Sequence, residues 1–398
     1  MRPARSAPPV RGGPPALRGE PCGGTAVSLD VTMTPLRVAF DTGPLHGQRT
    51  GIGFAVAAMQ AALAVRDEVT LQPYLISARA RPAAGTRRLP MPAAVAQRCW
   101  AVTDHPRADR WLGDAQLIHG TNYVVPPSRL PRLVSVYDCW FVRNPAEANP
   151  SVRRAGQVLR RAIAGGAVVH ASSHATADAV RALFPGAAVH TVHLGPLPLP
   201  DAPDTPPVAD IVDRRYILAI GTIERRKNLP RLVRAFAAVA AAHPDVQLVL
   251  AGSDGDDRIA VHEAVDALGP GVSNRVLFTG RVDDGVRSWL LRHAAVLAYP
   301  SLDEGFGFPL LDAMQAGVPV VASTAGSIPE VAGDAALLSA PDDVDALAAN
   351  LTLALDSQSV RADLIATGSV RWQQFSWDRC ASELTGLYRR VADGSAAD

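Results

Sequence analysis

The chain has 398 residues, of which 48% are hydrophobic and 19% are charged. This length exceeds that of an ordinary single domain, so two domains are expected. A formal net charge of +1 without a strongly basic block argues against a nucleic-acid partner, and no apolar run is long enough to span a membrane. The four cysteines have neither metal nor redox spacing, which fits reduced thiols in a cytoplasmic protein.

Residues 1–33 are rich in Pro, Gly and Arg and lack an apolar segment of signal-peptide type. This composition predicts a disordered N-terminal extension. A start codon assigned too early is the alternative, which we favour slightly, because Met33 comes directly before the first credible strand.

Residues 34–196 alternate short apolar runs with helical stretches, which predicts a first domain. A helix is expected over 54–65, and another follows the strand and polar turn that begin at 168. Strands are expected at 36–40, 115–120, 132–138 and 188–195. Apolar strands alternating with helices favour a parallel sheet that is covered on both faces.

A proline-rich stretch over 197–211, with five prolines, predicts a linker between two domains. A second alternating set over 212–374 then predicts a helix at 229–242. Its strands are expected at 216–221, 246–252, 275–280, 294–301 and 318–323. The tail, 375–398, begins with an amphipathic helix that we expect to pack on the first domain.

Two similar α/β halves joined by one linker predict a cleft with the two parallel sheets facing it, because ligand sites favour such domain interfaces. Within open α/β sheets, ligands bind at the carboxyl ends of the strands. Site residues are therefore expected on the loops that follow the strands.

The segment GTIERRKNL (221–229) has three consecutive bases in a loop between a strand and a helix. Guanidinium and ammonium groups beside a helix N-terminus suit a diphosphate. A solvated basic turn is the alternative that the spacing leaves open.

The segment DEGFGFPLLDAMQAG (303–317) has an acid on each side of a glycine–aromatic loop. Pro309 suits the first turn of a helix, so the backbone amides of Gly305–Phe308 form an anion cradle at its N-terminus. Glu304 and Asp312 could then accept hydrogen bonds from hydroxyl groups at both ends of one anionic ligand. For Asp312 alone, a favourable interaction with the helix dipole is the simpler interpretation.

These segments, together with RVLFTGRVDD (275–284), resemble the donor-binding half of retaining glycosyltransferases of family 4, which have the GT-B fold. TGIG (50–53), IHGTN (118–122) and VSVYDCWF (134–141) match the amino-terminal half more loosely. The resemblance runs from about Leu36 to about Val391. It implies two Rossmann-like domains, with nucleotide-sugar binding in the second.

The resemblance also implies a role for each matched residue. Glu304 would bind hydroxyls of the transferred hexose, and Asp312, where the family usually has Glu, would hold the ribose. Arg226 and Lys227 would neutralise the diphosphate, and His119 would face the sugar from the first domain. The remaining donor contacts would be Gly51, Gly53, Gly221, Thr222, Val282, Gly305, Phe306, Gly307 and Phe308.

Three departures from the family pattern bear on the donor. Asp312 is one methylene shorter than Glu, Thr222 stands where some members have another phosphate-binding Arg, and Tyr137 stands where His is frequent. No metal or other cofactor is expected. His170 and His174, in a strand-to-helix turn, favour a cap or polar-turn role over metal binding.

The expected reaction is retaining transfer of a hexose from a nucleotide-diphosphate sugar to a hydroxyl of a glycan or lipid-linked glycan. Mannose from GDP-mannose comes first and glucose from a UDP donor next. The expected location is cytoplasmic, with peripheral association at the inner face of the membrane left open. A nucleotide-sugar epimerase, a nicotinamide-dependent dehydrogenase and a catalytically degenerate sugar-nucleotide binder are the alternatives. TGIGFAVA does not complete the G-x-G-x-x-G pattern of the dehydrogenase.

Overall fold

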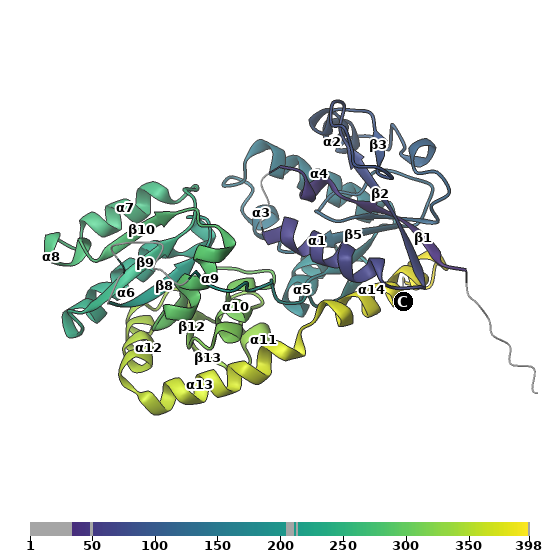
Figure 1. Cartoon of the computed structure of the whole chain (residues 1–398). Helices are drawn as coiled ribbons and strands as arrows, with labels where there is room; N and C mark the ends of the chain where they lie inside the picture. The colour runs from purple at the N-terminus through teal and green to yellow at the C-terminus, as the bar shows by residue number, and fades with distance from the viewer. Residues whose placement is uncertain (1–33, 48–50, 204–210, 212–213, 397–398) are drawn as a thin grey trace, which may run out of the picture. The chain divides into compact units, whose positions relative to one another are not determined.

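The computed structural model of the protein describes residues 34–47, 51–203, 211 and 214–396 (Figure 1). The predicted disordered extension at 1–33 lies outside these residues. The described strands form two sheets, one of seven strands and one of six.

The first sheet belongs to the first half of the sequence, drawn from purple to teal in Figure 1. Its strands are β1 (Leu36–Asp41), β2 (Val69–Ile76), β3 (Arg87–Leu89), β4 (Leu117–Gly120), β5 (Arg132–Val136), β6 (Val168–Ala171) and β7 (Val189–Thr191). Its helices are α1 (Gly51–Ala64), α2 (Ala93–Trp100), α3 (Trp140–Arg143), α4 (Pro150–Ala164) and α5 (His174–Leu183).

The second sheet is built from the chain after the linker. Its strands are β8 (Arg215–Ile220), β9 (Val246–Ala251), β10 (Val276–Gly280), β11 (Val296–Tyr299), β12 (Val320–Ser323) and β13 (Ala336–Ser339). The helices of this part are α6 (Leu229–Ala242), α7 (Arg258–Asp266), α8 (Pro270–Ser273), α9 (Asp284–His293), α10 (Phe308–Ala316), α11 (Ile328–Ala332), α12 (Val344–Asp356) and α13 (Gln358–Arg371).

Both sheets are parallel throughout, which confirms the predicted fold class of two Rossmann-like sheets. The first has the order β3-β2-β1-β4-β5-β6-β7 and the second β10-β9-β8-β11-β12-β13. In each sheet the order reverses beside its first strand, between β1 and β4 and between β8 and β11. Open α/β sheets bind ligands outside the strand ends at such reversals.

Apolar, β-branched sequences explain why the central strands form where they were predicted. Every residue of β4, β6, β9, β11 and β12 is buried, as expected of parallel strands covered on both faces. Strand β2 was not predicted. Its Pro73 pairs with Phe40 of β1 although proline cannot donate a ladder hydrogen bond, so its sequence reads poorly as an inner strand.

The C-terminal helix α14 (Trp377–Ala392) lies against α1 and contacts β1, β4 and β5 of the first sheet (Figure 1). Its Tyr388 is buried, and the Trp377 indole donates to the Pro196 carbonyl at 2.7 Å. In the linker region, Pro198 and Pro200 accept side-chain hydrogen bonds from α9. Across the described residues, no helix combines the length and apolar character that crossing a membrane requires.

Candidate active site

The reversal point of the second sheet brings together the loops that follow β8 and β11. Asn228 fixes their relation, because its side-chain amide donates to the Pro300 carbonyl at 2.9 Å and to the Pro341 carbonyl at 2.7 Å. Asn228 has a left-handed conformation, φ 59°, which Asn tolerates better than most residues. The turn before it, Arg225–Lys227, thereby faces the start of the β11 loop.

Glu304 lies at the centre of this site, 6% exposed. One carboxylate oxygen is bonded to Lys227 Nζ at 2.6 Å, and the other is in direct contact with Arg226 Nη1. Burial raises the pKa of Glu304, but the charges of Arg226 and Lys227 outweigh it and bring the value to about 2. Glu304 is therefore an anion at any physiological pH, held between the two cations predicted to meet a diphosphate.

Lys227 and Arg226 are further fixed by the end of β11 and the loop after it. Lys227 Nζ donates to the Tyr299 hydroxyl at 3.0 Å, and Arg226 Nη1 donates to the Asp303 carbonyl at 3.0 Å. Burial lowers the pKa of Lys227, while the charge of Glu304 opposes that shift. A small pocket opens beside Lys227, Gly221 and Tyr299.

The loop Gly305–Gly307 packs closely against the first half of the chain. A Cβ at Gly305 would lie 1.4 Å from the Tyr137 carbonyl oxygen, so only glycine fits. Its own carbonyl accepts hydrogen bonds from Ser172 Oγ at 2.9 Å and Thr176 Oγ1 at 3.2 Å. Gly307 has a φ of 93°, which also favours glycine.

The backbone amides of this loop bear on the predicted anion cradle. Among the described residues, the amides of Gly305, Phe306 and Gly307 donate no hydrogen bond to a loop or side-chain acceptor. Gly307 caps α10, so these donors lie at a helix N-terminus, where the dipole also favours an anion. Phe306 is buried, and its ring meets those of Phe308 and Phe375 edge-on.

Asp312 lies in α10, 3% exposed. Its Oδ2 pairs with Arg287 of α9 at 2.5 Å, while its Oδ1 is buried without a hydrogen-bond partner among the described residues. Burial raises the pKa of Asp312 to about 7, although the charge of Arg287 opposes the shift. The Oδ1 atom has an unused lone pair but is covered by protein atoms, and the predicted ribose contact stays a prediction.

His119 lies in a buried hydrogen-bond chain in the first sheet. Its Nδ1 is 2.8 Å from the Tyr388 hydroxyl and its Nε2 is 2.8 Å from Ser135 Oγ, which also contacts His170 Nδ1 at 2.8 Å. Burial lowers the pKa of His119 well below its usual range, so the ring is neutral. Both ring nitrogens are occupied, so contact with a sugar would require one of these bonds to break.

The remaining predicted donor contacts are dispersed around the second-sheet site. A Cβ at Gly51, the first residue of α1, would lie 3.8 Å from the Phe308 ring, so α1 begins beside the donor loop. Gly53, two residues further along α1, is buried. Thr222 Oγ1 is 3.5 Å from Ser253 Oγ, and Val282 packs half-buried against the core. Thr50 lies outside the described residues.

Sequence reasoning missed four charged residues that the fold brings to these loops. Arg143, after β5, pairs with Asp303 at 3.2 Å, and Arg287 pairs with Asp312. Asp41 ends β1 at the reversal of the first sheet, where burial raises its pKa to about 7. Of these, only Asp41 carried a signal in the sequence, as a carboxylate directly after a predicted strand.

Comparisons with known proteins agree with this geometry. The sequence profile described as Glycosyl transferases group 1 matches residues 214–357. The O-antigen chain mannosyltransferase B of Escherichia coli is 31% identical over 300 residues, covering 72% of this chain and 78% of that protein. The chain belongs to the glycosyl transferases group 1 family. The resemblance to glycosyltransferases with the GT-B fold that was found in the sequence is thus confirmed.

One further sequence relative and one solved structure are similar to this group 1 glycosyltransferase. Phosphatidyl-myo-inositol mannosyltransferase of Mycolicibacterium smegmatis is 32% identical over 182 residues, 45% of this chain and 46% of that protein, so the match spans about half of that relative. The crystal structure of Anabaena HepE in complex with UDP-glucose aligns with a TM-score of 0.64 at 18% identity, covering 89% of this chain and 99% of that one. With its two parallel sheets, the chain has the GT-B fold.

Proposed function

We propose that this glycosyltransferase moves a hexose, with retention of anomeric configuration, from a nucleotide-diphosphate sugar to a hydroxyl of a glycan or lipid-linked glycan. The observation that carries the proposal is the buried Glu304 carboxylate held between Arg226 and Lys227, beside free amides of the loop at the N-terminus of α10. A carboxylate that binds hydroxyls and a cationic, amide-rich cradle for an anion suit the two ends of such a donor.

Mannose is the sugar we favour, with GDP as its carrier, because two relatives at about 30% identity are named mannosyltransferases. Glucose from UDP-glucose is the second candidate, favoured by the structural likeness to HepE, which was crystallised with UDP-glucose. The matches lend no support to the epimerase alternative, and the dehydrogenase is set aside by the family.

The central step of the proposed mechanism is stabilisation of the negative charge that develops on the leaving diphosphate. As the anomeric bond breaks, negative charge grows on the leaving diphosphate. Arg226, Lys227 and the amides of Gly305–Gly307 stabilise it, and the Arg226 and Lys227 side chains are largely buried. Such preorganised electrostatics usually contributes most to catalysis. Glu304 orients the hexose hydroxyls. The leaving phosphate oxygen takes the proton of the acceptor hydroxyl, so no protein nucleophile and no metal ion are assigned a step.

The first half of the chain offers two features for an acceptor. Residues 34–196 contain 18 arginines and 9 acidic residues, a formal charge of +9, whereas residues 212–374 contain 14 basic and 20 acidic residues, a formal charge of −6. An anionic acceptor, such as a lipid diphosphate-linked glycan, or an anionic membrane surface suits the positive half. At the strand reversal, buried Asp41 can accept a hydrogen bond from an acceptor hydroxyl.

A thermal-shift screen with UDP, GDP, UDP-glucose and GDP-mannose tests the donor. We expect a rise in melting temperature with one nucleotide and its sugar, followed by mass-spectrometric detection of a glycosylated product with lipid-linked and free glycan acceptors. A GDP-specific shift supports mannose, and a UDP-specific shift replaces it by glucose. Donor binding without product over a broad acceptor panel would instead identify a sugar-nucleotide binder.

A further inference from the structure

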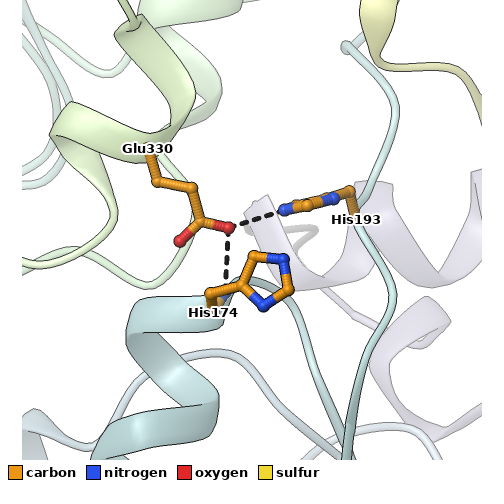
Figure 2. A group of neighbouring side chains, drawn as sticks. All are labelled: His174, His193 and Glu330. Carbon is orange, nitrogen blue, oxygen red and sulfur yellow. Dashed lines mark hydrogen bonds and ion pairs between the residues drawn. The ribbon is translucent and has the colours of Figure 1, made fainter.

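A group of two histidines and one glutamate lies beside the donor loop, with the His193 ring 6.4 Å from the Phe306 ring between centroids (Figure 2). His174 is the first residue of α5, His193 follows β7, and Glu330 lies in α11. One ligand atom from each side chain lies within 4.8 Å of the other two. His174 is exposed, and His193 and Glu330 are about one-fifth exposed, so solvent reaches the group from one side.

The Glu330 carboxylate is oriented by more than one neighbour. Its Oε1 accepts a hydrogen bond from the His174 backbone amide at 2.8 Å, and its Oε2 accepts one from the Ala175 amide at 3.0 Å. His193 Nε2 donates to Oε1 at 2.6 Å. Because a carboxylate oxygen has two lone pairs, these bonds fix the group and still leave it able to bind a cation.

The His174 ring is the member without a hydrogen bond among the described residues. Its backbone amide is bonded to Glu330, but its imidazole has only an edge-on contact with His193, with ring centroids 5.3 Å apart. The N-cap of α5 is Ser173, whose hydroxyl accepts from the Thr176 amide, so of the predicted cap or polar-turn roles the His174 ring does not fill the cap. The His193 ring is flanked by Phe375 at 5.6 Å between centroids.

We propose that His174, His193 and Glu330 form a binding site for Zn²⁺, with water completing the coordination. Two imidazoles and one carboxylate are a ligand set that favours zinc and related transition metals over Mg²⁺ and Ca²⁺, which prefer oxygen ligands. Tetrahedral zinc places its ligand atoms about 3.3 Å apart, so the ligand atom of the exposed His174 ring has to move inward by up to about 1.5 Å.

The proton balance of binding involves His193. Its Nε2–H donates to Glu330 in the metal-free protein, and a nitrogen that carries a proton cannot bind a metal ion. Zinc binding therefore requires the neutral His193 ring to change tautomer, with its single proton moving from Nε2 to Nδ1 so that the bare Nε2 binds the metal. The hydrogen bond between His193 and Glu330 is exchanged for two bonds to the metal, and the backbone amides of α5 continue to hold the carboxylate.

Isothermal titration of the full chain with Zn²⁺, in the absence of nucleotide, tests the site. We expect one equivalent to bind, and His174→Ala and Glu330→Gln each to weaken binding about tenfold or more. Titration with Co²⁺ should produce the visible absorption bands of a four-coordinate ion in the wild type and lose them in His174→Ala. His262→Ala, which removes a histidine outside the group, should bind as the wild type does.

His174→Ala decides the result, because this exposed ring has no hydrogen bond to any residue that the structure describes, and its removal should leave the metal-free melting temperature unchanged. The absence of one-to-one binding in the wild type overturns the site. Equal affinity in His174→Ala also overturns it, since the ion would then be held elsewhere. The readout uses no donor or acceptor, so its outcome is independent of the proposed transferase activity.

Discussion

At the strand reversal of the second sheet, Glu304 is buried between two cations, whereas at the reversal of the first sheet Asp41 is buried with no cation beside it among the described residues. Around Asp41 the neighbouring groups are uncharged: the Gly43 amide donates to its Oδ1 at 2.8 Å, and Thr121 Oγ1 donates to its carbonyl at 2.9 Å. We call the loops at the strand reversal of the second sheet, around Glu304, the charged edge. The loops at the reversal of the first sheet, around Asp41, are called the neutral edge.

This difference separates two binding tasks. A diphosphate needs fixed positive charge that does not have to be reorganised when the ligand arrives, and the charged edge supplies it. A sugar hydroxyl needs hydrogen-bond acceptors and donors. The neutral edge offers such groups without burying a set of fixed charges. We therefore propose that the donor binds at the charged edge and the acceptor hydroxyl at the neutral edge. Variants at each edge test the two proposals separately.

The largest effect is expected from Glu304→Gln at the charged edge. The amide leaves Arg226 and Lys227 buried without their counter-ion, which costs about 3–5 kcal/mol of unfolding free energy. It also replaces the carboxylate proposed to bind the hexose, so we expect at least a hundredfold loss of transfer rate. Urea unfolding and a product assay measure the two effects.

Glu224→Gln is the matched control, since Glu224 is 3.6 Å from Arg226 but its side chain is 43% exposed. It should leave both stability and transfer close to wild type. Near-normal turnover in Glu304→Gln would remove Glu304 from the proposed hexose contact, whatever its effect on stability.

Asp41→Asn tests the neutral edge through pH. Burial raises the pKa of Asp41 from 3.8 to about 7, so the folded state binds a proton that the unfolded state has released between these values. Wild-type stability from this group therefore falls as pH rises through that window. The asparagine variant should gain stability relative to wild type over the same window, by about 1.4 kcal/mol per pH unit at most.

The control for this curve is Asp109→Asn. Burial raises the pKa of Asp109, but hydrogen bonds from the Arg129 amide and the Ser128 hydroxyl outweigh it and lower the value. Its stabilising contribution is present above the unfolded pKa of 3.8 and is lost in acid, so this variant should lose stability relative to wild type as pH rises to 3.8 and then stay level up to pH 7. Curves of the same sign for the two variants would contradict a buried, unpaired Asp41.

Ser135→Ala should have a smaller effect at the same sheet. The change leaves His119 Nε2 and His170 Nδ1 buried without their shared partner, at a cost of about 1–3 kcal/mol. Chemical unfolding measures it against Ser369→Ala, an exposed serine bonded only within its own helix. Equal stability of the two variants would contradict this expectation, and would mean that water or a rotated ring replaces the hydrogen bonds of Ser135 to the two histidines.

The charged edge was largely predictable from sequence because its parts are local. Glu304, the glycine loop and the N-terminus of α10 lie within fifteen consecutive residues, and Gly307 and Pro309 mark the helix start by their backbone preferences. Arg226 and Lys227 form an equally local cluster. Only their meeting with Glu304, across 77 residues, required the fold.

The neutral edge and the contacts between the two halves were not predictable in this way. Arg143 and Asp303 are 160 residues apart, and His193 and Glu330 are 137 apart, and neither pair has a distinctive local pattern. His119 matched a family position, yet its hydrogen bond to Tyr388 depends on a helix 269 residues away. Such pairs follow from packing, which periodicity and motif spacing do not encode.

The smallest difference that we test lies within the charged edge, between the roles of Glu304 and Asp312 in the 303–317 segment. Glu304 is bonded to the cations beside the proposed reacting centre, whereas Asp312 pairs with Arg287 through Oδ2 and has a buried Oδ1 without a partner among the described residues. Asp312→Glu lengthens the acid proposed to hold the ribose, away from the bond that breaks. We therefore expect a changed KM for the donor with kcat within a few-fold of wild type.

Glu304→Asp is the reciprocal change, because it shortens the acid at the hexose end by the same methylene. It should lower kcat more than it raises the donor KM, since the interaction lost is one that grows in the transition state. Steady-state kinetics of both variants with one donor and one acceptor compare them directly. A collapse of kcat in Asp312→Glu with unchanged KM would mean that Asp312 acts at the reacting centre, and the two acids would then share one task at this edge.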